Sequence, residues 1–172
     1  MSVIPRRSLV TRKAALRGAV AVELALLTIP LVLMTLALVE YSRAMWTYNQ
    51  LVRLTREGAR YLSGFDANNP NYASAMTIAK NRMLYGSNAA GSLPVVPGLT
   101  SSMIEFCDRS TSSLPAGCSG LSYSDVSLGA TGSINLVRVQ IRGFQFQPAY
   151  SGVSKLGAVT FDIISTTMRQ GL

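Results

Sequence analysis

The chain has 172 residues, enough for one ordinary domain and an anchoring segment, and its formal net charge is +8. Five of the positive charges lie in residues 1–18, which contain no Asp or Glu, so removing them leaves residues 19–172 with a net charge of only +3. Because of this placement, and because no nucleic-acid-binding motif occurs, we do not expect nucleic acid as a partner.

A basic stretch, residues 1–18, is followed by a long apolar stretch, residues 19–39. As a helix, the apolar stretch would be about 31 Å long, which matches the core of a bilayer. Lys and Arg are enriched on cytoplasmic flanks, so we expect the N-terminus to lie in the cytoplasm. The stretch is longer than the apolar part of a secretory signal peptide, which predicts a retained membrane helix.

Two residues interrupt the apolar stretch. Pro30 removes one backbone hydrogen bond and predicts a kink or a local loosening of the helix. Glu23 places a carboxylate in hydrocarbon, which costs about 2.5–3.5 kcal/mol by insertion scales. Glu23 should therefore have a partner or a function; the alternative is that it lies near the cytoplasmic headgroups and is solvated there.

The junction of the two stretches reads RGAVAVE, from Arg17 to Glu23. This pattern resembles a type IV prepilin signal, in which a prepilin peptidase cuts after the glycine and a glutamate is the fifth residue after the cut. The resemblance implies a cleavage site between Gly18 and Ala19, with residues 1–18 as a basic prepilin leader. It also implies a subunit-assembly role for Glu23, whose carboxylate can pair with the new amino group on Ala19 of a neighbouring subunit.

The chain is similar, more narrowly, to the TadE-like minor pilins (pseudopilins) of tight-adherence (Flp-type) pilus systems. Three stretches carry the resemblance: RGAVAVELALLTIPLVL, LTREGARY at residues 54–61 and TTMR at residues 166–169. The family often has an aromatic residue after the glutamate, where this chain has Leu24. The resemblance implies a single-pass protein of the bacterial inner membrane with a periplasmic C-terminal domain. Its partners would be the prepilin peptidase, other pilin or pseudopilin subunits and the pilus assembly platform.

The helix is expected to continue beyond the membrane as an extension over residues 40–64. Its start carries three aromatic residues, Tyr41, Trp46 and Tyr48. They suit an aromatic belt at the membrane surface, and packing against the protein's own domain is a compatible alternative. Apolar residues then recur at helical spacing, and Gly64 is a suitable helix end.

The stretch Glu57-Gly58-Ala59 places small residues on this extension. Small residues let another surface approach closely. That surface is either the protein's own sheet, which we favour, or the helix of a partner subunit.

Residues 65–172 are expected to form an extracytoplasmic globular head. The sequence predicts a helix over 72–84, a loop over 86–100, and strands over 102–107, 137–141 and 158–168. At Gly143 the apolar alternation changes phase, so that Phe144 and Phe146 become the apolar set, which predicts a bulge or a bend there. The fold class is therefore α+β and type IV pilin-like, a long N-terminal helix packed on a small antiparallel sheet.

Cys107 and Cys118 are the two cysteines of the chain, and the segment between them is polar and rich in turn-forming residues. In an oxidising compartment, a disulfide closing this short loop is the natural interpretation. The alternative is a pair of unrelated reduced thiols.

No residue pattern indicates catalysis. The chain has no histidine, its carboxylates outside the long helix are scattered, and no phosphate-binding glycine motif occurs. We expect no enzyme, no cofactor, no metal site and no small-molecule substrate. Besides a tight-adherence minor pilin, two alternatives stay open: a pseudopilin of a secretion system, and a signal-anchored envelope protein with an enzymatic or ligand-binding role.

Overall fold

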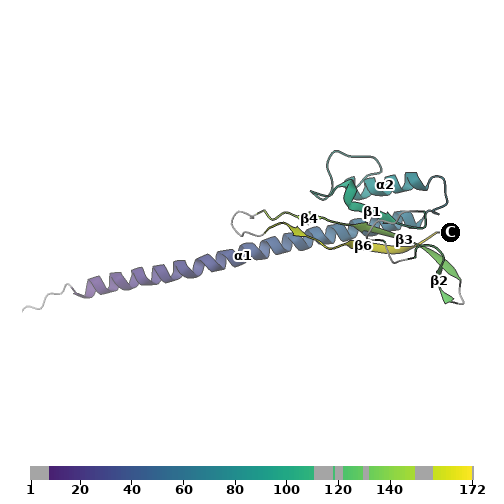
Figure 1. Cartoon of the computed structure of the whole chain (residues 1–172). Coiled ribbons are helices and arrows are strands. Elements are labelled where there is room, and N and C mark those ends of the chain that lie inside the picture. The colour runs from purple at the N-terminus through teal and green to yellow at the C-terminus, as the bar shows by residue number, and fades with distance from the viewer. Residues whose placement is uncertain (1–7, 111–117, 119–121, 130–131, 150–156, 172) are drawn as a thin grey trace, which may run out of the picture.

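The computed structural model describes residues 8–110, 118, 122–129, 132–149 and 157–171. One long helix, α1 (Ser8–Ser63), runs almost the full length of the molecule, and the sheet and the second helix gather on its C-terminal half (Figure 1). The N-terminal half of α1 projects alone. The predicted α+β class, a long apolar helix with a small antiparallel sheet, is confirmed.

Helix α1 begins earlier than the apolar stretch alone indicates. It starts at Ser8 instead of Ala19, because residues 8–18 are mostly good helix formers and contain no proline. It stays helical through Pro30 and ends at Ser63, where the sequence placed its end.

The two halves of α1 differ in burial. Residues 18–39 are almost all exposed, with Leu24 65% and Met34 71% exposed. From Glu40 onward one face is covered by the head, and Leu51 and Leu62 are completely buried. The change follows the sequence, because apolar residues surround the first half and form a single stripe in the second.

The main sheet is antiparallel and centred on β3. Its strands are β1 (Ile104–Cys107), β2 (Val126–Ser127), β3 (Ser133–Ile141) and β6 (Ile164–Gln170). Strand β3 pairs with β1 and β2 along one edge and with β6 along the other. It begins earlier than the predicted strand over 137–141, because its first residues pair with β2.

Gly143 lies at a bend between β3 and β4 (Gln145–Phe146), as the change of apolar phase predicted. Its φ of 72° is in the left-handed region that favours glycine. After the bend, Phe144 and Phe146 are buried and Gln145 is exposed.

The prediction of a single strand over 158–168 was wrong, because two strands occupy this stretch. Strand β5 (Val159–Thr160) pairs with β4, whereas β6 pairs with β3. Since β4 has turned away from β3 at Gly143, the returning chain must change partner. Phe161 lies at this change and stacks between Phe144 and Phe146, with ring centroids 5.8 and 6.3 Å away.

A second helix, α2 (Tyr72–Tyr85), lies beside α1 on the same side of the sheet (Figure 1). Gly86 ends it in the left-handed conformation, with its N–H donated to the carbonyl of Arg82 at 2.9 Å. The following segment, residues 87–100, contains neither helix nor strand, as predicted. Val96 and Leu99 of this segment are nevertheless buried in the core. A short 3₁₀ helix, η1 (Ser101–Met103), then leads into β1.

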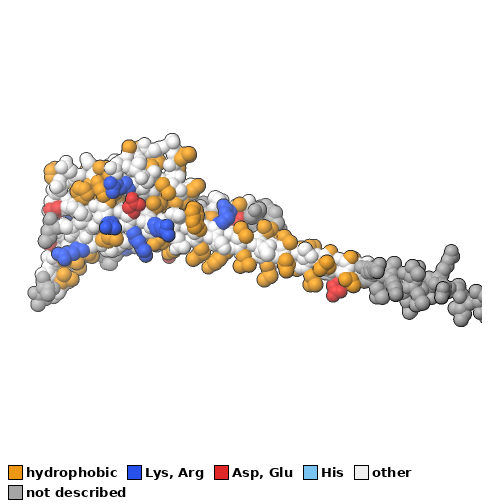
Figure 2. Space-filling model, turned by 180° about the vertical axis from the view of Figure 1, so that it is seen from behind, with side chains coloured by type: hydrophobic (Ala, Val, Ile, Leu, Met, Phe, Trp, Pro, Cys, Tyr) orange, Lys and Arg blue, Asp and Glu red, His pale blue; other side chains and the backbone are white. Residues whose placement is uncertain are grey.

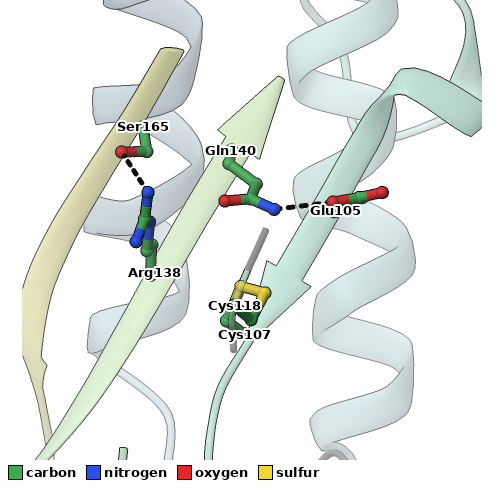
Figure 3. Close-up of a disulfide and its surroundings, with 6 residues drawn as sticks. All are labelled: Glu105, Cys107, Cys118, Arg138, Gln140 and Ser165. Atoms are coloured by element: carbon green, nitrogen blue, oxygen red, sulfur yellow. Dashed lines mark hydrogen bonds between the residues drawn. A yellow bond between two sulfur atoms is a disulfide. The ribbon is translucent and has the colours of Figure 1, made fainter. Parts of the chain in front are cut away.

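The disulfide Cys107–Cys118 is present and joins the end of β1 to the following loop. Figure 3 shows it on the face of the sheet that is turned away from both helices, beside Gln140. Gln140, which the alternation placed on an exposed face, is completely buried and donates from Nε2 to Glu105 Oε2 at 2.6 Å. Strand β3 is therefore covered on both faces at this level.

Tyr72 connects the start of α2 to this corner of the sheet. Its hydroxyl donates to the carboxylate of Asp108 at 2.8 Å, and that carboxylate also accepts the N–H of Ser110. Burial, followed by the charge of Asp108, raises the pKa of Tyr72 well above its usual range, so the phenol stays protonated.

Gly58 lies where α1 packs tightly against α2 and the sheet. A Cβ built at this position would meet Met83 Sδ of α2 at 2.6 Å and Val139 Cγ1 of β3 at 3.4 Å. Met83 and Val139 are completely buried. The neighbour of this small residue thus belongs to the same subunit, but the predicted sheet is only the second contact, because Met83 of α2 lies nearer than Val139.

Replacing Gly58 with Ala is expected to destabilise the protein by about 1–2 kcal/mol. Overpacking costs roughly 1–3 kcal/mol, and the better helix propensity of alanine returns at most about 1 kcal/mol. Chemical denaturation of the full chain in detergent measures the difference. Gly64→Ala is the matched control, because its nearest new contact is at an ordinary 3.6 Å. A Gly58→Ala protein as stable as the control would contradict the close approach.

Candidate functional site

The predicted cleavage site lies on the projecting half of α1. Gly18 and Ala19 are exposed, and a Cβ added at Gly18 would meet no atom within 4 Å. No part of the described head covers this point. Gly18 and Ala19 are inside the helix and open to the surroundings on its surface, and the cut itself stays a prediction.

Glu23 lies just beyond this point on the same exposed surface. The side chains around it are apolar, and Val20, Val22 and Leu26 are all more than 60% exposed. Among the residues that the structure describes, Glu23 makes no hydrogen bond and no ion pair. If this part of the helix is desolvated, a partner for the carboxylate has to come from outside the described subunit.

The helix that carries Glu23 is the candidate membrane anchor. Over the described residues, the Gly18–Ser63 part of α1 is long and apolar enough to cross a membrane, and none of its most apolar window is buried. Figure 2 shows hydrophobic side chains around the narrow half of the molecule. A core helix of a soluble protein would be covered, so the exposure favours a membrane or another subunit as its surroundings.

Glu40 has a role that the sequence did not reveal. It begins the expected extension of the helix beyond the membrane, but it is only 5% exposed and binds two groups of the protein itself. Arg43 Nη1 donates to its carboxylate at 3.0 Å, and the backbone N–H of Ala149 donates to Oε1 at 2.9 Å. Glu40 therefore holds the segment after β4 against α1. The spacing of three residues between Glu40 and Arg43 could have predicted their ion pair, whereas no feature of the sequence indicated the contact with Ala149.

The three aromatic residues near the expected membrane exit have different surroundings. Tyr48 contacts Phe161 edge-to-face, with ring centroids 5.7 Å apart, so it packs against the protein's own head. Tyr41 and Trp46 are 66% and 64% exposed. Tyr41 borders an open apolar groove between α1 and the β4–β5 pair. Packing against the protein's own domain is therefore confirmed for Tyr48, whereas an aromatic belt at the membrane surface stays a prediction for Tyr41 and Trp46.

Within the described ranges, no three His, Cys, Asp or Glu side chains come together as metal ligands. Cys107 and Cys118 are bonded to each other. The candidate site is the exposed apolar half of α1, residues 18–39, in which Glu23 is the acidic residue.

Within the described residues, the structure combines one candidate membrane-spanning helix with a small α+β head. Residues 18–60 match the model of a family described as TadE-like protein. Searches among curated proteins and among solved structures found no match. The matched segment includes Gly18, Glu23 and the stretch around Gly58, which confirms the resemblance over the long helix. The match suggests involvement in the tight-adherence (Flp) pilus system.

Proposed function

We propose that the protein is a minor pilin or pseudopilin, anchored in the bacterial inner membrane, that takes part in assembling a tight-adherence pilus. Its N-terminal helix would pack against the helices of other pilin subunits. The observation that carries the proposal is the apolar half of α1, which lies within the TadE-like match and has no covering partner in the described subunit.

The exposed apolar side chains explain why such a helix would pack against other subunits once it leaves the lipid. In the bilayer, lipid chains surround Leu24, Leu27 and their apolar neighbours, so these side chains are not exposed to water. Outside the bilayer, each such side chain in water would forgo about 1.5–3 kcal/mol of burial. A subunit extracted from the membrane therefore needs the helices of neighbouring subunits around it, as the core of a fibre provides.

Glu23 would set the position of one helix against the next. A buried carboxylate without a partner is strongly unfavourable, and pairing with the amino group of Ala19 on a neighbour lowers that cost. This pairing requires the cut after Gly18, because the amino group exists only after cleavage. Prepilin peptidase is thus a required partner in this proposal, and no catalytic activity of the chain itself is part of it.

Cleavage after Gly18 is the experiment that tests this proposal. When the full chain is produced together with a prepilin peptidase, N-terminal sequencing of the membrane fraction is expected to begin at Ala19. Without the peptidase, the N-terminus should retain residues 1–18. Gly18→Val should block processing, because a side chain is introduced at the cut.

The control for this experiment is Gly64→Val, which changes an exposed glycine far from the cut and should leave processing unchanged. A mature N-terminus that never begins at Ala19 in the presence of the peptidase would refute the assignment of this site.

A further inference from the structure

The head-bearing half of α1 has a second exposed feature, on the face turned away from the sheet. Arg53, Arg56 and Arg60 are exposed and follow one another at spacings of three and four residues, so they share one side of the helix. We call these three residues the arginine row. Figure 2 shows several Lys and Arg side chains on the broad, head-bearing part of the molecule.

The arginine row lacks partners within the described parts of the subunit. Some basic residues of the head are engaged: Arg43 binds Glu40, Arg82 lies over the ring of Tyr61, and Arg138 donates to Ser165. Arg109, Arg142 and Arg169 make no such contact with the described residues either, but they lie in three separate segments and form no row. The row has no such contact. Glu57 lies among its members, but no ion pair forms with it in the described structure. Three positive charges are thus left facing outward.

The membrane surface does not suit the arginine row as a partner. If the membrane span ends at Val39, Arg53 lies about 21 Å further along the helix, and Arg60 lies beyond it. Electrostatic attraction in physiological salt decays over about 8 Å. The row is therefore beyond the range at which anionic headgroups would hold it.

A second copy of this chain does not suit the row either. A symmetric contact through this face would place arginines against arginines. Apart from Glu57, the exposed acidic residues of the described head are Asp125 and Asp162, which are isolated in separate segments. The complementary charge has to be supplied by a different protein.

We infer that the arginine row docks an acidic surface of a different protein subunit beside the head. Arginine suits this role because its planar guanidinium binds carboxylates through two parallel hydrogen bonds, which fixes orientation as well as attraction. Trp46, seven residues before Arg53, extends the same side of α1 with a large exposed ring. The inference rests on the proposed membrane anchoring but not on the cut at Gly18 or on Glu23.

Photo-crosslinking in the cells that naturally make the protein tests this inference. Asn49 is exposed between Trp46 and Arg53, so benzoylphenylalanine at this position is the probe. We expect an adduct with a different protein, attached within a segment rich in Asp and Glu. Reversing the row to Arg53→Glu, Arg56→Glu and Arg60→Glu should lower the adduct yield about tenfold, since each exposed ion pair contributes modestly.

The matched control reverses three other exposed arginines, Arg109→Glu, Arg142→Glu and Arg169→Glu, which changes the net charge equally. It should keep the adduct. Equal thermal stability of both triple variants excludes misfolding as the cause. An adduct with a second copy, an adduct outside an acidic segment, equal loss in both variants, or no adduct at all would overturn the inference. Cleavage at Ala19 and pairing by Glu23 are read out separately, so they can fail independently.

Discussion

Replacing Glu23 with Gln is expected to abolish fibre assembly while cleavage after Gly18 continues. Glutamine has nearly the same shape and is cheaper to place in hydrocarbon, so the anchored subunit should insert normally. It carries no charge, and it leaves the amino group of Ala19 on a neighbour buried without its partner. Breaking such a pair costs about 3–5 kcal/mol, which corresponds to more than about a hundredfold in each helix–helix contact.

Electron microscopy of surface fibres and N-terminal sequencing of the same cells give the two readouts. Glu57→Gln is the matched control, because Glu57 lies on the same helix, is exposed beyond the expected span, and makes no ion pair in the described structure. Normal piliation by Glu23→Gln would refute the pairing role. A block in cleavage would show instead that the peptidase, and not the neighbouring subunit, reads the carboxylate.

Features that depend on neighbouring residues were predictable from the sequence. The end of α1 at Ser63, the bounds of α2 and the change of phase at Gly143 all follow from apolar spacing and from glycine. The same holds for Glu23, because one carboxylate in a long apolar stretch is conspicuous without any structure. The burial of Val137, Val139 and Ile141 also follows from the sequence, because these residues alternate with polar ones along the strand.

Features that depend on distant residues were not predictable. The division of the last strand into β5 and β6 follows from the direction in which β4 leaves Gly143, and not from the strand's own residues. Glu40 meets a backbone N–H that is 109 positions away in the sequence. Gln140 has the polarity of an exposed residue and is buried because the disulfide corner covers that face. A single chain likewise cannot show which subunit approaches Glu23.

Removing the disulfide, by Cys107→Ala with Cys118→Ala, is expected to lower the free energy of unfolding by about 3 kcal/mol. The bond joins residues with a sequence separation of 11, and closing a loop of this size restricts the unfolded chain by about that amount. Asp108, next to Cys107, accepts a hydrogen bond from Tyr72 of α2. Loss of the disulfide would therefore also weaken the packing of α2 on the core.

Denaturant unfolding of the full chain in detergent, with and without dithiothreitol, measures this loss. The reductant should destabilise the original protein by a similar amount and leave the double variant unchanged. Free thiols at both positions in freshly isolated, denatured protein would contradict the bond. Because such bonds form in oxidising compartments, the same labelling reports topology. Oxidised cysteines in the membrane-anchored protein would favour a head outside the cytoplasm, where both the proposed pilus contacts and the arginine row would have to meet their partners.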